Sequence, residues 1–276
     1  MRKGFVITVS TLLMLMVIIM FSQSSQRITK ESNRAVIDTE MIDSASYMFD
    51  DVAEDLKGML GPQVSISRNI SESNITIIEQ LPRSIDDNAL LSSYGSFISN
   101  YSEKINSNIS LNFSSITNGS LLIFRNGLEY DRNSSLLQFY YPNGDTNASA
   151  YEIGIFSNGY RTTENISSLQ QSGATKLVIH YLDLNGSIEA SGSFDPNVLG
   201  TYRINYENPL GSLVIKVGNL SGSVGGIRIE DDGLQAGINI TARGGWNDSL
   251  GYAYNAGMNY TQLNVSKSDV IWVEEG

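Results

Sequence analysis

The chain has 276 residues, a formal net charge of -11 and no cysteine. The acidic balance argues against a nucleic-acid partner, because a phosphate-binding face needs clustered Lys and Arg. Without Cys there are no disulfides and no thiolate metal sites, so a domain of this chain must be held together by its hydrophobic core, which its length allows.

The first predicted element is the uncharged, mostly apolar run between Lys3 and Arg27. As a helix with a rise of about 1.5 Å per residue, it would cross a hydrocarbon core of about 30 Å. Arg2 and Lys3 precede it, and basic residues favour the cytoplasmic side. The sequence thus predicts a membrane anchor in residues 1–26, in contact with lipid over residues 4–26. The protein is then a single-pass protein of the cell membrane, with its N-terminus inside and its C-terminal domain extracellular.

Two other interpretations of this run remain open. A cleavable secretory signal would end at a small-x-small site such as Ser22-Gln23-Ser24. The tip Arg2-Lys3-Gly4-Phe5, directly before an apolar helix, resembles the class III signal of type IV pilins and archaeal pilin-like surface proteins. This resemblance implies cleavage after Gly4, Phe5 as the first mature residue, and a helix that packs in the centre of a filament. Val9 stands where that family has Glu.

A second helical pattern fills residues 27–61. Its apolar residues recur at steps of three and four, which places them on one stripe of a helix: Ile37, Met41, Ala45, Met48, Val52, Leu56 and Met59. No Pro or Gly interrupts residues 5–57, so this stalk can continue the first helix as one rod, until Gly58, Gly61 and Pro62 end it. The stripe fits packing on the chain's own domain and self-association through the helix equally well.

Residues 62–276 are predicted to form a β-rich domain that contains one further helix. Alternating residues at 64–68 and 75–78 indicate a first pair of strands. The helix follows, capped by Ser84, and its buried face is predicted to hold Leu90, Leu91, Tyr94, Phe97, Ile98, Tyr101 and Ile105. Beyond Asn108 the sequence predicts strands only.

Four turn motifs mark hairpins in this domain: Asn126-Gly127, Pro142 to Asp145, Asn158-Gly159 and Asn185-Gly186. Asn-Gly suits them because two-residue hairpins need positive φ angles. Later strands are predicted at 212–217, 225–230, 234–242 and 270–274. Many short strands predict an antiparallel β-sandwich, either one large or two small with a split near 162–173. The predicted fold is thus a transmembrane helix that continues into a helical stalk, followed by a mainly β ectodomain.

Asn-x-Ser/Thr acceptors for N-glycosylation are about three times as frequent as the roughly five expected by chance. The fifteen acceptors all follow the apolar run: Asn69, Asn74, Asn100, Asn108, Asn112, Asn118, Asn133, Asn147, Asn165, Asn185, Asn219, Asn239, Asn247, Asn259 and Asn264. We therefore expect covalent glycans, although turn chemistry in an Asn-rich β protein produces such triplets too.

Catalytic motifs are scarce. The sole histidine, His180, lies in a predicted strand, and a structural role is favoured over one as a general base. Three acidic turns contain oxygen ligands that suit calcium, at Asn143 to Asn147, at Asp86 to Asn88 and at Glu230 to Gly233. Solvated turns explain them better, because Asp, Asn and Gly are common turn residues. We expect no enzyme, no cofactor and no metal site.

The sequence favours a structural role for this glycoprotein, as a pilin-like filament subunit or an anchored component of the cell envelope. The alternative is an adhesin or a carbohydrate-binding sandwich. Its sugar-stacking rings would come from the aromatic C-terminal region: Trp246, Tyr252, Tyr254, Tyr260 and Trp272. Packing of these rings within the core is the other interpretation.

Overall fold

The computed structural model describes residues 2–69, 71–82, 86–142, 144–169, 172–208, 210–246, 251–262 and 265–273. Of residues 2–13, 38 and 208 it describes the backbone only.

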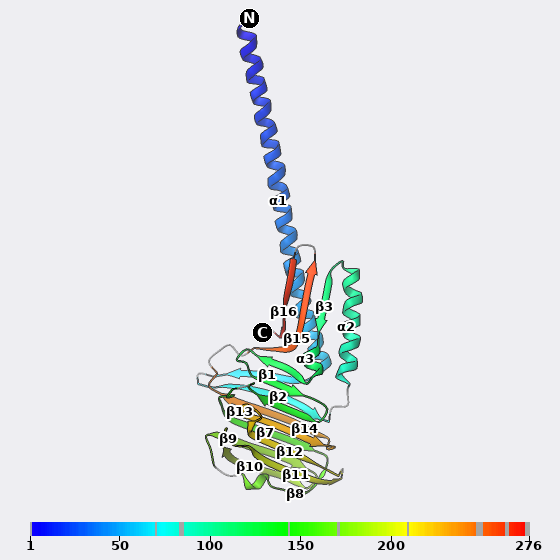
Figure 1. Cartoon of the computed structure of the whole chain (residues 1–276), viewed down its shortest axis with the longest axis vertical. Helices are drawn as coiled ribbons and strands as arrows, with labels where there is room; N and C mark the ends of the chain where they lie inside the picture. The colour runs from blue at the N-terminus through cyan, green and yellow to red at the C-terminus, as the bar shows by residue number, and fades with distance from the viewer. Residues whose placement is uncertain are drawn as a thin grey trace.

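Helix α1 runs without interruption over Arg2–Leu60, and it projects as a long rod from a β-rich head (Figure 1). It ends as predicted. Gly61 has a φ of 73°, and its N–H donates to the carbonyl of Lys57 at 3.3 Å. A left-handed glycine followed by Pro62 is a common way to end a helix, because Pro cannot continue it.

The predicted membrane anchor is corrected by the structure. In the part of the chain whose side chains are described, no helix is long and apolar enough to cross a membrane. The fold class with a transmembrane helix was therefore wrong, and so was the location in the cell membrane with an extracellular C-terminal domain. Residues 4–13 of the predicted span lie outside the described side chains.

Only the last third of α1 packs on the head. Its buried apolar residues begin at Ala45 and recur every three or four positions: Ala45, Phe49, Val52, Ala53, Leu56 and Leu60. Met48 and Met59 are partly buried against the same core, whereas Ile37 is exposed. Packing on the chain's own domain is thus confirmed for the end of the predicted stripe, mainly against β16 and β15.

Two β-sheets form the head. The first, sheet A, has the strand order β1-β2-β14-β7-β9-β10. Its strands are β1 (Gln63–Arg68), β2 (Ser73–Leu81), β14 (Ala236–Gly244), β7 (Ala148–Ser157), β9 (Thr175–Asp183) and β10 (Gly186–Phe194). All neighbouring strands in it are antiparallel except β7 and β9, which are parallel.

The second sheet, sheet B, has the order β16-β15-β4-β5-β6-β13-β12-β11-β8, with β3 paired to β15. Its strands are β16 (Val265–Val273), β15 (Tyr252–Gln262), β4 (Ser120–Phe124), β5 (Glu129–Arg132), β6 (Leu136–Tyr140), β13 (Ser223–Asp232), β12 (Gly211–Leu220), β11 (Gly200–Asn208), β8 (Tyr160–Glu164) and β3 (Asn108–Asn112). The mainly β, sandwich-like head is thus confirmed. Each sheet contains strands that precede residues 162–173 in the sequence and strands that follow them. Both halves of the sequence therefore build each sheet.

Strand β15 links the sandwich to the helices. Its first residues pair with β4 and its later residues pair with β3, with a register shift between Tyr254 and Gly257. Strands β16, β15 and β3 lie beside the end of α1 and beside α2, Asp87–Lys104 (Figure 1). One continuous core joins this helical part to the sandwich.

Helix α2 confirms the predicted second helix, with two differences. Its N-cap is Asp86, whose carboxylate accepts bonds from the N–H groups of Asn88 and Ala89; the predicted cap, Ser84, lies outside the described residues. Its aromatic residues Phe97 and Tyr101 are exposed. Two further short helices, α3 (Ser114–Thr117) and η1 (Ile166–Ser168), interrupt the part that was predicted to hold strands only.

Two of the four predicted hairpins are confirmed. Asn126-Gly127 joins β4 to β5, and Asn185-Gly186 joins β9 to β10, with positive φ angles at both glycines. The other two motifs do not join paired strands. Pro142 to Asp145 leads from β6 in sheet B to β7 in sheet A, and Asn158-Gly159 leads from β7 to β8 in sheet B.

Candidate functional site

The longest run of exposed large apolar residues in the described part of the chain lies on the free part of α1. Eight consecutive large apolar residues, Met14 to Phe21, are all exposed, with Met14 at 73% and Phe21 at 74%. Consecutive residues of a helix point in directions about 100° apart, so these eight side chains cover every side of the rod. A helix that is apolar all round belongs inside a larger assembly, because an exposed patch of this size marks an interaction site.

The rod becomes polar directly after this stretch. From Ser22 to Gln26 the residues are uncharged and mostly polar, and Arg27 then pairs with Glu31 one turn later, at 3.0 Å. Both partners of this ion pair are exposed, so it contributes little to stability. The part of the helix that needs an apolar partner therefore ends near Phe21, and the helical turns after it are suited to water.

A buried arginine fixes the junction between the rod and the head. Arg132 of β5 donates to the carbonyl of Leu60, the last residue of α1, at 2.8 Å. The same guanidinium forms ion pairs with Glu79 of β2 and with Asp87 of α2, the latter at 2.8 Å. Burial by itself would lower the pKa of Arg132, but the two carboxylates raise it. One cation on β5 thus holds α1, β2 and α2 at residues that are 72, 53 and 45 positions away from it in the sequence.

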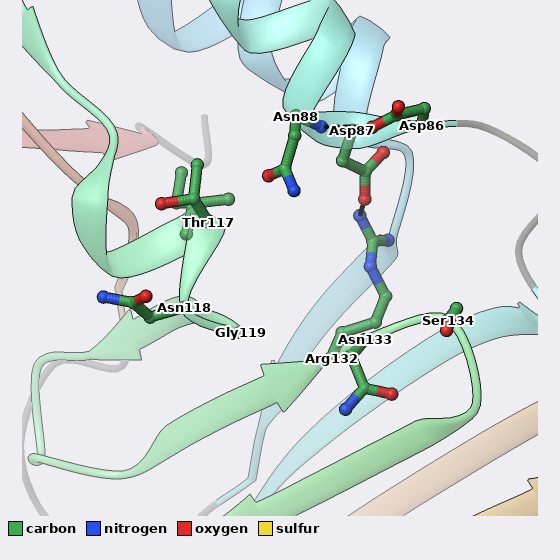
Figure 2. Close-up of a pocket in the computed structure, with 10 residues that line it drawn as sticks. Asp86, Asp87, Asn88, Thr117, Asn118, Gly119, Arg132, Asn133 and Ser134 are labelled. Carbon is green, nitrogen blue, oxygen red and sulfur yellow. Dashed lines mark hydrogen bonds and ion pairs between the residues drawn. The ribbon is translucent and has the colours of Figure 1, made fainter.

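This arginine is one of the residues that line a polar hollow of about 500 Å³. Figure 2 shows Arg132 reaching toward Asp87 at the start of α2, with Asn118 and Gly119 after α3 on one side and Asn133 and Ser134 on the other. Both carboxylates at its rim have partners within the protein: Asp86 caps α2 and Asp87 pairs with Arg132. The hollow thus has an anchoring role in the fold, and two of its lining residues, Asn118 and Asn133, are glycosylation acceptors.

The predicted glycosylation acceptors lie on the surface of the head wherever the structure describes them. None of the thirteen described acceptors is buried; eleven are exposed, and Asn74 and Asn239 are partly buried in sheet A. Asn247 and Asn264 lie outside the described residues. No acceptor precedes Leu60, so the whole of α1 is free of them.

The side chain of His180 lies on the outer face of sheet A between two carboxylates. Its Nε2 is 3.5 Å from Glu152, and its Nδ1 is 3.9 Å from Glu189. Glu152 also pairs with Arg243 at 2.7 Å. All four residues are at least partly exposed and come from neighbouring strands, so they form cross-strand pairs.

The acidic turns bring together no cluster that could hold a metal ion: the described residues contain no group of three or more His, Cys, Asp or Glu side chains placed to do so. Asp145 accepts from the N–H of Asn147, and Asp231 accepts from the N–H of Leu234, as turn residues do. Glu230 pairs with Lys216 at 2.7 Å. Asn143 lies outside the described residues.

A partly buried acid pair lies on the outer face of sheet B. Asp131 and Glu129 are two residues apart on β5, and Glu129 accepts bonds from Ser120 and Tyr140. One carboxylate oxygen of Asp131 is buried and has no partner among the described residues. Burial, together with the negative charge of Glu129, raises the pKa of Asp131 to about 6.

The C-terminal aromatic residues are packed into the fold. Trp246, Tyr252, Tyr254 and Tyr260 are buried in the core, and Trp272 lies under the guanidinium of Arg125 at 5.0 Å. The exposed rings are elsewhere, and one of them, Phe156, lies on the outer face of sheet A.

No sequence motif points to Arg132 or to Phe156. A lone Arg and a lone Phe in predicted strands look like ordinary surface and core residues, and only the strand pairing shows what lies beside them. The processing residues Gly4 and Phe5 fall outside the described side chains, so cleavage there stays a prediction.

Comparisons of the chain with protein-family models, with curated proteins and with solved structures found no match.

Proposed function

We propose that this protein is the structural subunit of a pilin-like surface filament. In this filament the apolar stretch of α1 packs against the same stretch of neighbouring copies, and the β head, which is N-glycosylated, faces outward. One observation carries the proposal: all eight residues from Met14 to Phe21 are exposed, and they cover every side of the helix.

The distribution of these residues favours a bundle of several copies. A two-helix seam would leave half of the rod in water, because it covers only one stripe of each helix. Burying a large apolar side chain stabilises an assembly by about 1.5–3 kcal/mol. Eight such residues per subunit therefore favour an arrangement in which each helix is surrounded by others.

The glycosylation acceptors support the same arrangement. All fifteen follow Leu60, so no sugar would interfere with helix packing in the centre. The tip Arg2-Lys3-Gly4-Phe5, which resembles a pilin-type signal, also fits.

The test compares the full-length protein with two variants in α1. In Ile18→Asp a charge lies in the middle of the apolar stretch, whereas Ser24→Asp places the same charge in the polar turns that follow. An unpaired charge costs several kcal/mol in an environment without water, and a filament repeats this cost in every copy. We expect the native chain and S24D to form filaments in negative-stain micrographs. I18D should yield at least tenfold less sedimentable protein than S24D.

A thermal melt of the head serves as the folding control. Ile18 is not part of the hydrophobic core of the head, so I18D should leave the melting temperature unchanged. The proposal would be overturned by a native chain that stays monomeric at micromolar concentration. It would also be overturned by an I18D protein that assembles as well as S24D.

A further inference from the structure

Asn239 occupies an unusual place for an asparagine. It lies in the middle of β14, a central strand of sheet A (Figure 1). Its neighbours Ile238 and Ile240 are buried in the core, so the Asn239 side chain is on the outer face of the sheet. Asn is depleted in strands, and the amide oxygen of Asn239 is buried without a partner among the described residues. A hydrogen bond to the amide oxygen therefore does not explain why Asn stands here.

An exposed aromatic ring lies directly beside it. Asn239 is paired with Gly154 of β7, and Phe156 is two residues further along β7 on the same face. A Cβ atom placed on Gly154 would lie 3.4 Å from Cε2 of Phe156 and 3.6 Å from Cβ of Asn239. The ring thus leans back over the bare backbone of Gly154 and ends next to Asn239. It is 56% exposed.

The surroundings leave space above this ring. On the β14 side, the partner of Phe156 is Gly237, which has no side chain. On the β9 side, its partner is Leu182, an apolar side chain that is 46% exposed on the same face. A half-exposed ring that has glycines on one side and the exposed Leu182 on the other is suited to the C–H face of a sugar, because aromatic faces bind apolar and weakly polarised groups.

We propose that Asn239 carries an N-linked glycan whose first sugar stacks on the ring of Phe156. The Asn239-Ile240-Thr241 triplet provides the acceptor. In the transfer, Nδ2 of Asn239 bonds to the anomeric carbon of a sugar on a phosphate carrier, the bond from that carbon to the phosphate oxygen breaks, and the amide loses one proton to a base of the transferase. This inference rests on the glycosylation that is part of the proposed function.

Asn259 is the matched control. It is also a strand residue with an acceptor triplet, and it is exposed on β15. Its cross-strand partners are Ser110 and Ser268. A sugar on Asn259 would therefore have no ring to stack on at either paired position.

The test first maps glycopeptides of the native protein and then measures melting temperatures. Six proteins are compared, each made with and without the host's oligosaccharyltransferase: the native chain, F156A, N239Q, F156A/N239Q, N259Q and F156A/N259Q. The unglycosylated set shows what each substitution does by itself.

Stacking on an aromatic ring is a modest stabilising contact, so we expect the sugar at Asn239 to raise the melting temperature by about 2–4 °C. This increment should disappear in F156A, while the increment from Asn259, measured with N259Q, should be the same with and without Phe156.

An unmodified Asn239, or an increment that survives in F156A, would overturn the inference. Filament formation is scored separately. Chains that assemble with Asn239 unmodified would contradict only this inference, and chains modified at Asn239 that fail to assemble would contradict only the filament.

Discussion

At the scale of single residues, Arg132 is the side chain on which the attachment of the rod most depends. It is buried, and it joins the last carbonyl of α1 to carboxylates on β2 and α2. A buried ion pair adds little net stability compared with an apolar pair of the same shape, but removal of one partner leaves an uncompensated charge.

We therefore predict that Arg132→Met lowers the free energy of unfolding by about 3–5 kcal/mol, because Glu79 then stays buried without its cation. Arg243→Met is the control. Its ion pair with Glu152 is also short, at 2.7 Å, but it is exposed, so the loss there should be below about 1 kcal/mol. Urea unfolding of both variants measures the difference, and equal losses would show that the buried network does not stabilise the junction.

Asp131 gives a prediction of pH dependence. Its pKa is raised from 3.8 to about 6 in the folded protein, so the folded state binds this proton more tightly than the unfolded state. The stability that this proton contributes is fully present below pH 3.8 and is lost as the pH rises through about 6. Asp131→Asn should therefore stabilise the protein at pH 7–8 by about 1–3 kcal/mol, with a gain that vanishes near pH 3.5. A gain that is the same at both pH values would contradict the raised pKa.

At the scale of elements, α1 consists of a free part and a docked part. Leu56 is fully buried against the head, whereas Ile37 is exposed on the rod. We predict that Leu56→Ala destabilises the head by about 2–5 kcal/mol, because it leaves a cavity. Ile37→Ala should change the stability by less than about 0.5 kcal/mol.

Chemical denaturation measures both changes, with hydrogen exchange at residues 45–60 as a second readout. A loss for Ile37→Ala as large as that for Leu56→Ala would mean that the rod is docked along more of its length than the structure shows.

Much of the element pattern could be predicted from the sequence, because it depends on local chemistry. The end of α1 followed from Gly61 and Pro62, and the hairpins at Asn126-Gly127 and Asn185-Gly186 followed from the φ angles that Asn-Gly tolerates. The connection at Asn158-Gly159 has the same residues, yet it crosses between the sheets. A turn motif fixes the local backbone but does not determine which strand the chain pairs with next.

The candidate site was harder to predict. An apolar run such as Met14 to Phe21 shows that something must cover it, but a bilayer, a cleaved signal and a helix bundle give the same residue pattern. Phe97 and Tyr101 illustrate the same limit on α2: their helical spacing predicted burial, but they are exposed. The ring of Phe156 beside Asn239 results from the pairing of β14 with β7, which lie far apart in the sequence.

At the scale of the whole molecule, the apolar surface and the glycosylation acceptors are at opposite ends. The acceptors are confined to the head and its loops, while the exposed apolar stretch lies at the far end of the rod (Figure 1). Such a molecule can bury its apolar end only against further copies of that end or against another apolar partner. Its polar head stays in water. This separation is what the proposed filament requires.

The most direct test of self-assembly through α1 uses the absence of cysteine from the chain. Ile18→Cys and Ser191→Cys each introduce one thiol, the first in the apolar stretch and the second on the outer face of β10. A short bifunctional maleimide is then added to each assembled full-length protein. We predict efficient cross-linking between copies at position 18 and little at position 191. Assembled protein in which position 18 stays unlinked, or in which both positions react alike, would contradict the proposal that the apolar helices pack together in the centre.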